Sequence, residues 1–327
     1  MIYLETNSVN PCYNLAFEEY VLYHCKEDNY LILWQNDNTI VVGQNQNTEE
    51  EVNRTFVNER KIHVVRRATG GGAVYHDLGN LNYSFITDYK QSDRITKERF
   101  MMPIIRALSN LGLAAEASGR NDILVNGKKI SGTAQRIAGD RLLHHGTLLF
   151  DSDLSMISSA LNVKADKYRS KGLKSVRSRV GNIRDSLRQD MDIRSFWSYL
   201  EETLAGSGYV KREMSPEELK AIKDLKQKKY DTWEWIYGKS PAFNFSNSGR
   251  FPGGSLEVRI DIRKGIIQEI QFFGDFLGRI PLDPVVHALA GCPYEQTKVR
   301  ETLSVYSLEP FFGTIHLDDI ERVIFDL

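Results

Sequence analysis

The sequence has no apolar run long enough to cross a bilayer, a span that takes about 20 residues as a helix. Its N-terminus, MIYLETNSVN, also lacks the basic and apolar regions of a secretory signal peptide. These two absences argue against the membrane and exported classes. We therefore expect a cytoplasmic protein that makes no membrane contact.

Cysteine is scarce, and charge is balanced. Cys12, Cys25 and Cys292 form no CxxC pair, so neither a disulfide framework nor a zinc site is indicated. Lys and Arg number 42 against 43 Asp and Glu, which gives a net charge of -1. Because there is no positive field to hold a phosphate backbone, a nucleic-acid partner is not expected. Any ligand must be recognised by a local site.

Four common functional motifs are missing as well. The sequence contains no GxxxxGKS or GxxxxGKT, no GxGxxG, no HExxH and no GxSxG arrangement. Their absence argues against the usual phosphate-loop, dinucleotide, metalloprotease and serine-hydrolase sites. A nucleotide site, if present, must be built in another way.

The patterns that are present mix short strands with helices. Asn10 and Pro11 predict the start of a helix that ends near residue 25. The β-branched and aromatic runs at 30–34 and 39–42 flank a turn-rich tetrapeptide and predict a hairpin. Thr and Glu spaced as a capping box predict one helix over 48–59.

Further along, the alternation continues. Strands are expected at 62–65, 73–76 and 82–86, a helix at 96–111, a meander over 122–150 that begins with an Asn126-Gly127 hairpin turn, and helices at 192–204 and 215–228. The polar, basic stretch 164–179 predicts a long loop. The fold class is therefore α+β, with mixed β-sheets and flanking helices.

The chain is longer than a typical single domain, so two domains are expected. Asn247-Ser248-Gly249 predicts a turn, and after it strands at 256–262 and 266–273 precede short helices. We predict a larger domain over 1–245 and a smaller α+β domain over 246–327.

One cluster that could carry chemistry is Arg66-Arg67-Ala68-Thr69-Gly70-Gly71-Gly72, which runs into a strand. Glycines let the backbone approach a ligand and offer N–H groups to anionic oxygens, and arginine supplies a forked donor. A tight turn would also explain two glycines. Three glycines beside paired arginines favour an anion site.

A second cluster is Asn121-Asp122 with Lys128-Lys129. Because neighbouring strand residues face opposite sides, only one of the two lysines can point at a site. Asp122 could hold a magnesium ion, and a lysine on the next strand could meet the phosphates that this ion bridges. Each residue taken alone is better explained as a surface charge. We do not assign His144-His145 as a metal site, because adjacent strand residues diverge and no acidic or cysteine ligand is suitably spaced.

Taken together, these segments resemble the lipoate-protein ligase family, which is related to the biotin-protein ligase catalytic domain. The matching pieces occur in family order: NLAFEEYVL (14–22), LILWQNDNTIVVGQNQN (31–47), RRATGGGAVYHDLGNLNYSFI (66–86), GRNDILVNGKKISGTAQ (119–135), HHGTLLFD (144–151) and SKGLKSVRSRVGNI (170–183). The chain beyond about residue 247 resembles the small accessory domain of the family only loosely. One departure is Gln44, where many members have Arg or Lys, and we assign it no role.

The resemblance implies a set of site residues. It selects Lys129 as the catalytic lysine that contacts both the lipoate carboxylate and the adenylate phosphate. It implies ATP or adenylate contacts for Arg67, Gly72, Ala73, Val74, Tyr75, Asn80, Asn121, Asp122 and Lys129, with Asp122 at the metal. It implies lipoate contacts for Trp34, Arg67, Thr69, Gly71, Gly72, His76, Lys129, His145 and Gly146.

The function implied by the resemblance is activation of lipoate by ATP and Mg²⁺ to lipoyl-adenylate, followed by transfer to a lysine of a carrier protein. The carriers would be E2 lipoyl domains of 2-oxoacid dehydrogenases or the glycine cleavage H protein. A monomer is expected. Closure of the loop at 164–179 could keep water from the adenylate.

Two alternatives stay open. An octanoyl- or lipoyl-transferase of the same fold would use a cysteine thioester, yet residues 117–123 read ASGRNDI without a cysteine. A non-catalytic protein that binds lipoyl carriers would not need Lys129 or the glycine triplet, and both are present.

Overall fold

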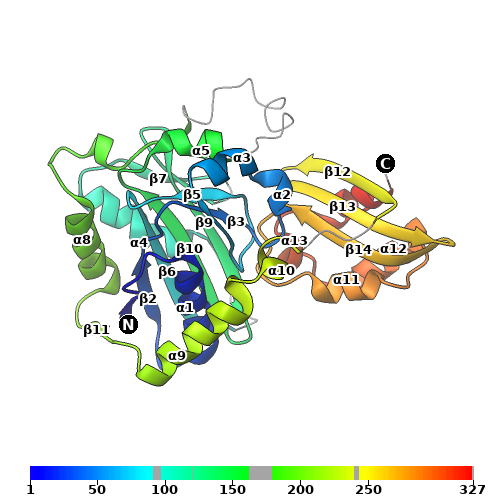
Figure 1. Ribbon diagram of the computed structural model, residues 1–327, viewed down its shortest axis with the longest axis horizontal. Helices are drawn as coiled ribbons and strands as arrows, with labels where there is room; N and C mark the ends of the chain where they lie inside the picture. The colour runs from blue at the N-terminus through cyan, green and yellow to red at the C-terminus, as the bar shows by residue number, and fades with distance from the viewer. Residues whose placement is uncertain (91–96, 120, 162–178, 239–242, 326–327) are drawn as a thin grey trace.

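The structure is a computed structural model that describes residues 1–90, 97–119, 121–161, 179–238 and 243–325 (Figure 1). The predicted basic loop at 164–179 lies, apart from its last residue, outside the described residues. Figure 1 shows a larger α+β body and, at the other end of the long axis, a smaller unit that carries the C-terminus.

The larger body is built on an eight-stranded sheet of order β11-β1-β2-β6-β10-β9-β8-β7. Strand β1 runs parallel to both of its neighbours, and the other pairs are antiparallel. The strands are β1 (Ile2–Glu5), β2 (Tyr30–Trp34), β6 (Asn80–Asp88), β7 (Ala115–Ser118), β8 (Asp122–Val125), β9 (Lys128–Ala138), β10 (Arg141–Leu149) and β11 (Val210–Lys211).

Helices cover both faces of this sheet. Helices α4 (Lys97–Asn110) and α8 (Ile193–Ala205) pack on one face, in a core that includes Leu31 and Leu33 of β2. Helices α1 (Pro11–His24) and α9 (Pro216–Leu225) pack on the other face, with Ile32 and Trp34. The alternation along β2 follows the period of two that a strand imposes. Trp34 therefore faces α1, the side on which the pocket described below lies.

A small second sheet of order β4-β3-β5 packs beside the larger one. Its strands are β3 (Thr39–Val42), β4 (His63–Arg66) and β5 (Val74–His76). Ile40 and Val42 of β3 share an apolar cluster with Val57 and Ala160. This cluster attaches α3 (Arg54–Glu59) and α5 (Leu154–Ala160) to the sheet, and its member Val52 directly follows α2 (Thr48–Glu51).

The C-terminal unit has a core of its own, drawn from residues 245–325. It contains an antiparallel sheet of β12 (Phe245–Phe251), β13 (Gly254–Arg263) and β14 (Ile266–Gly274). Four short helices follow, α11 (Asp283–Leu289), α12 (Gln296–Ser304), α13 (Glu309–Phe312) and α14 (Leu317–Phe325). Helix α10 (Trp233–Ile236) precedes the unit, and the boundary near 245 stays a prediction.

Several local predictions are confirmed. The Asn10 side chain caps α1 by accepting from Tyr13 N, and Ser215 opens α9 in a full capping box with Glu218. The Asn126-Gly127 turn has φ of 52° and 73°, the left-handed pair that a two-residue hairpin requires.

Others are wrong. Strands β2 and β3 do not form a hairpin, because β2 pairs with β1 and β6 while β3 joins the small sheet. The helix predicted over 48–59 is broken at Asn53, which caps α3. Thr48 is the first residue of α2, and its hydroxyl donates to Ile236 O and accepts from Arg66 Nη2. The turn predicted at 247–249 lies inside β12. Strands β1, β7 and β11 were not predicted, because they are short, lie at or next to an edge of the sheet, and show little hydrophobic alternation.

Candidate active site

A half-open pocket lies between the α1 face of the large sheet and the small sheet. Most of the predicted site residues line it: Trp34, Arg67, Gly71, Gly72, Ala73, Val74, His76, Asn121, Lys129, His145 and Gly146. The sequence had not assigned a role to the other lining residues, Leu15, Val41, Asn82, Gly132, Thr133, Ala134 and Thr147. All seven lie within the motifs quoted above, which was the available signal.

At the open end, strand geometry separates the two lysines as expected. Lys129 lines the pocket, and its Nζ forms an ion pair with Asp122 Oδ1 at 2.7 Å. Lys128 is exposed and lies beside Gly181, where an added Cβ would sit 2.8 Å from Lys128 Cδ. Asn121 donates from Nδ2 to Thr133 O at 2.9 Å, which ties the start of β8 to β9. Lys129 is thus the lysine whose charge reaches the pocket.

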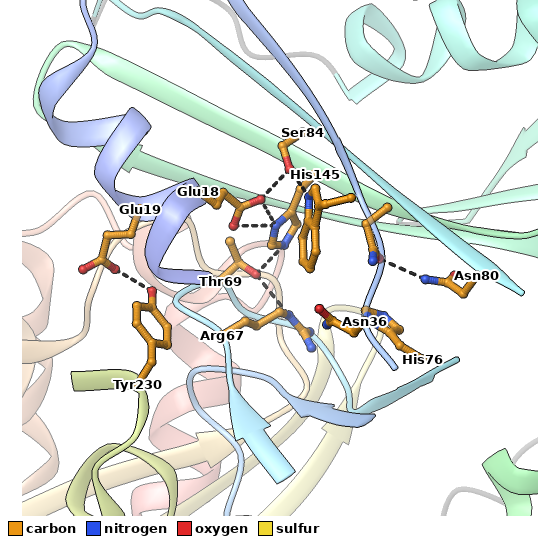
Figure 2. Close-up of polar contacts among 12 residues, drawn as sticks. Glu18, Glu19, Asn36, Arg67, Thr69, His76, Asn80, Ser84, His145 and Tyr230 are labelled. Carbon is orange, nitrogen blue, oxygen red and sulfur yellow. Dashed lines mark hydrogen bonds and ion pairs between the residues drawn. The ribbon is translucent and has the colours of Figure 1, made fainter. Parts of the chain in front are cut away.

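The closed end contains a buried polar chain (Figure 2). His145 Nδ1 lies 2.9 Å from Glu18 Oε1, and His145 Nε2 lies 2.8 Å from Thr69 Oγ1. Arg67 Nε donates to the same Thr69 hydroxyl. Because the Glu18 carboxylate only accepts, a ring hydrogen of His145 sits on Nδ1, facing Glu18. Ser84 Oγ also donates to Glu18, at 2.5 Å. Glu18 was not assigned from the sequence, although it lies in the NLAFEEYVL segment.

The two paired arginines organise loops through the backbone. Arg67 donates to Val41 O, Gly70 O and Gly72 O as well as to Thr69, which holds the glycine turn in shape. Arg66 donates to three carbonyls of loop 43–46 and to the carbonyls of Trp235 and Ile236. Burial lowers the pKa of each arginine to about 10. A direct contact of Arg67 with ligand stays a prediction.

His76 forms one side wall of the pocket. Its Nδ1 lies 3.2 Å from the Nδ2 atom of Asn36, and both residues are labelled in Figure 2. The Oδ1 atom of Asn36 accepts a hydrogen bond from Asn14 Nδ2. Burial, with Arg67 and His145 nearby, lowers the pKa of His76 to about 3. The ring is therefore neutral near pH 7, and because Nδ1 accepts from Asn36, its hydrogen sits on Nε2.

Four predicted residues, Thr69, Tyr75, Asn80 and Asp122, are not among those that line the pocket. Thr69 bonds His145 of the wall, and Asp122 bonds Lys129. The Tyr75 ring packs in the core of the small sheet, its hydroxyl donates to Asn38, and burial raises its pKa to about 12. Asn80 is fully buried and donates to Asn82 Oδ1 at 3.1 Å. Their contacts with nucleotide stay predictions.

The C-terminal unit touches the glycine turn directly. Gly71 N donates to Phe276 O at 3.1 Å, and Gly71 has φ of 93°, which a side chain would disfavour. Two more backbone bonds join the units: Gly274 N donates to Asn45 O at 2.8 Å and Ile137 N to Arg279 O at 2.7 Å. The glycine turn is thus shared between the two units.

Comparison with known proteins identifies this arrangement. A family model described as "Lipoyl protein ligase A/B catalytic domain" matches residues 10–205, and one described as "Bacterial lipoate protein ligase C-terminus" matches 240–324. Lipoate-protein ligase LplJ of Bacillus subtilis is 41% identical over 99% of this chain and 100% of its own length. Lipoate–protein ligase 1 of Staphylococcus aureus is also 41% identical, with 99% and 100% covered. The chain belongs to the lipoate-protein ligase family.

Solved structures agree with this family assignment. P. falciparum LipL1 in complex with lipoate has a TM-score of 0.77 at 25% identity, with 94% of each chain covered. The bipartite lipoate protein ligase of Thermoplasma acidophilum, described with its E2 lipoyl domain, has a TM-score of 0.63 at 32% identity, covering 75% of this chain and 98% of that one. A lipoate-protein ligase A bound with ATP has a TM-score of 0.61 at 30% identity, covering 72% and 98%. The chain is therefore a ligase enzyme with the expected fold.

The thiols of this lipoate-protein ligase family member lie away from the pocket. Cys12 Sγ donates to Tyr230 O at 3.2 Å, and burial, with Asp231 nearby, raises its pKa to about 12. Burial also raises the pKa of Cys25, and Cys292 belongs to the core of the C-terminal unit. A reactive thiolate needs a lowered pKa beside the substrate, so the geometry gives no support to a cysteine-thioester transferase. No described helix has the length and apolar character needed to span a membrane.

Proposed function

We propose that the chain joins lipoate to ATP as lipoyl-adenylate, releasing pyrophosphate, and then transfers the lipoyl group to a carrier lysine. The observation that carries the proposal is a lysine ammonium at the open end of a pocket whose other end is closed by apolar and hydrogen-bonded side chains. Such a pocket suits an acid with an apolar tail. The family relatives described with lipoate and with ATP support the same ligands here.

In activation, a carboxylate oxygen of lipoate attacks the α-phosphorus, a new P–O bond forms, and the bond to pyrophosphate breaks. Negative charge gathers on the phosphate oxygens during this step. Lys129 supplies a fixed positive charge there. Its ion pair with Asp122 holds the ammonium in place before the substrates arrive. Stabilisation of this kind is effective because the donor needs no reorganisation at the moment of reaction.

Magnesium fits as an ion that arrives with ATP. Among the described residues no cluster of three or more His, Cys, Asp or Glu could hold a metal alone. Mg²⁺ is commonly bound by one or two carboxylates together with substrate phosphates, and Asp122 offers one carboxylate at the phosphate end. When bound, the ion would neutralise phosphate charge. Asp122 would then exchange part of its contact with Lys129 for the metal.

The acyl tail of lipoate would lie along Trp34 and Leu15 toward His145. Trp34 is held by its Nε1, which donates to Ser84 Oγ at 3.0 Å, and His145 is held by Glu18. Because Trp34 Nε1 and both ring nitrogens of His145 are already bonded, an apolar tail can enter without stripping partners from these groups.

For the transfer step we propose an E2 lipoyl domain or the glycine cleavage H protein as carrier. The archaeal relative is described with its E2 lipoyl domain, which supports the first of these. We also propose that the protein is a cytoplasmic monomer, since the described residues that line the pocket all come from one chain.

The decisive test is mass spectrometry of an apo lipoyl domain incubated with the enzyme, lipoate, ATP and Mg²⁺, each omitted in turn. The lipoyl mass should appear only in the complete mixture. Modification without ATP from an octanoylated carrier would support the transferase alternative instead. No modification under any condition, with tight carrier binding, would support the non-catalytic alternative.

We also propose that the C-terminal unit assists activation more than transfer, because it bonds the glycine turn through Phe276 O. A chain ending near residue 245 should lose most pyrophosphate exchange while still transferring from synthetic lipoyl-adenylate. Circular dichroism must first show that this truncation is folded, since its exposed interface could cause aggregation. Full exchange by the folded truncation would contradict the assisting role.

A further inference from the structure

Asn82 is a pocket residue with an unused donor. It is 2% exposed, lines the pocket, and has its Oδ1 engaged by Asn80 Nδ2 at 3.1 Å. Its Nδ2 has no hydrogen-bond partner within the part of the chain that the structure describes. A buried donor without a partner is unfavourable, and in a binding pocket it indicates an acceptor on the ligand.

The register of the sheet locates this donor along the pocket. Asn82 pairs with Trp34 on β2 and with Thr147 on β10, so the three side chains share one face. Thr147 Oγ1 accepts from Gly132 N at 3.2 Å, and a Cβ added at Gly132 would lie 3.2 Å from Lys129 Nζ. Asn82 therefore belongs to the row of side chains nearest the Lys129 ammonium.

The next row inward carries Ser84 and His145, which also pair across the sheet. Two residues along a strand span about 7 Å, so this row lies deeper in the pocket by roughly the length of the aliphatic chain of lipoate. With the carboxyl group at Lys129, the acyl carbon lies at the Asn82 row and the dithiolane ring lies at the His145 row. The strong acceptors of lipoate are its carboxyl oxygens, whereas its sulfurs accept weakly.

We propose that Asn82 Nδ2 donates a hydrogen bond to the acyl oxygen of bound lipoate and of lipoyl-adenylate. In transfer, the neutral amine of a carrier lysine attacks the acyl carbon, a C–N bond forms, and the carbonyl π electrons move to that oxygen. Asn82 stabilises the resulting oxyanion. The oxyanion then reforms the C=O bond, the C–O bond to AMP breaks, and the surplus amine proton leaves to solvent. This inference rests on the ligase chemistry proposed above.

The kinetic test uses Asn82→Asp, which keeps the shape but replaces the donor by an acceptor, and Asn82→Leu, which removes the donor. Asn58→Asp, on the exposed surface of α3, is the matched control. Each enzyme is given synthetic lipoyl-adenylate or octanoyl-adenylate and an apo lipoyl domain. Loss of one oxyanion donor should lower the single-turnover transfer rate about 100- to 1,000-fold, equally for both adenylates.

The comparison with octanoyl-adenylate tests which part of the substrate Asn82 Nδ2 faces, because the octanoyl group has no sulfur. A loss confined to the lipoyl substrate would mean that Asn82 faces the dithiolane ring, and it would overturn the proposal. So would transfer at the wild-type rate in both variants. Failure of the wild-type enzyme to transfer at all would count against the ligase function itself, so the two failures are distinguishable.

A second measurement does not depend on turnover. A lipoyl-adenylate analogue with a sulfamate in place of the phosphate and a ¹³C-labelled acyl carbonyl is bound to each protein, and its carbonyl stretch is recorded by infrared difference spectroscopy. The band should shift to higher frequency in Asn82→Leu and Asn82→Asp than in wild type and Asn58→Asp. An unshifted band in variants that bind the analogue would overturn the contact.

Discussion

The two ends of the pocket differ in their exposure to solvent. At the closed end Glu18, Thr69 and His145 are 5%, 1% and 7% exposed. At the open end the side chains of Lys129 and Asp122 are 36% and 33% exposed. The closed-end groups are bonded to one another in a continuous chain. The open-end pair is bonded once and faces water. The first arrangement fixes the shape that the acyl tail meets, and the second leaves charge available for phosphate.

The difference shows how one site can treat two parts of a substrate separately. Interactions in a buried, fully bonded wall are the same for the ground state and the transition state, so they should govern affinity. Interactions with charge that develops on phosphate are realised in the transition state, so they should govern rate. Substitutions at the two ends should therefore separate KM from kcat.

The largest effect is expected at the open end. Lys129→Ala should lower lipoate-dependent pyrophosphate exchange by about 100- to 1,000-fold, as loss of one transition-state donor typically does. Lys128→Ala is the matched control, since this neighbouring ammonium lies on the exposed side of β9. Exchange near the normal rate in Lys129→Ala would show that the open end does not act as described.

A smaller effect, mainly on affinity and stability, is expected at the closed end. Glu18→Gln removes the charge that accepts from Ser84 and His145, and hydrogen bonds to charged groups contribute about 1.5–3 kcal/mol each. The KM for lipoate should rise and the melting temperature should fall, with little change in the KM for ATP. Glu19→Gln is the control, because Glu19 bonds Lys229 and Tyr230 outside the pocket. An altered KM for ATP, with the KM for lipoate unchanged, would contradict the assignment of the acyl tail to the closed end and of phosphate to the open end.

His76 offers a test of the side wall through pH. Its folded-state pKa of about 3 lies below the ordinary value of 6.5, so the unfolded chain binds a proton in that window and the folded chain does not. Stability must then fall as pH falls below 6.5, by about 2 kcal/mol between pH 6.5 and pH 5 from this residue. Urea unfolding at the two pH values should show a smaller drop for His76→Gln than for wild type. An equal drop in both proteins would mean that folding does not lower the pKa of His76.

The open end was the easier part of the site to predict. Strand alternation left only one of the two lysines for the site, the family pattern selected Lys129 over Lys128, and Asn121 and Asp122 stood in the same motif. Glu18 was missed because it lies on α1, far from β10 in the chain, and only the fold brings it to His145. Arg66 and Arg67 were predicted as an anion site, yet their donors are used on backbone carbonyls that no sequence pattern specifies.

The same limit explains the errors in the fold. Elements with local signals, such as the Asn10 cap, the Ser215 capping box and the Asn126-Gly127 turn, were predicted correctly. The pairing of β2 with β1 and β6 instead of β3 depends on contacts between distant residues. Hydrophobic alternation marks a strand and says nothing of which neighbour it takes.

Replacement of the three cysteines, which belong to neither end of the pocket, is expected to leave the ligase activity unchanged. A Cys12→Ser, Cys25→Ser, Cys292→Ser variant should remain an ATP-dependent ligase, because the acyl group is activated on phosphate and the raised pKa values of Cys12 and Cys25 disfavour a thiolate. Cys12 gives its thiol hydrogen to Tyr230 O, a contact that serine can keep. Lipoylation of an apo lipoyl domain, with the melting temperature measured alongside, checks the variant. An acyl-thioester trapped on any of the three in wild type without ATP, and lost in the variant, would support transferase chemistry in place of adenylation.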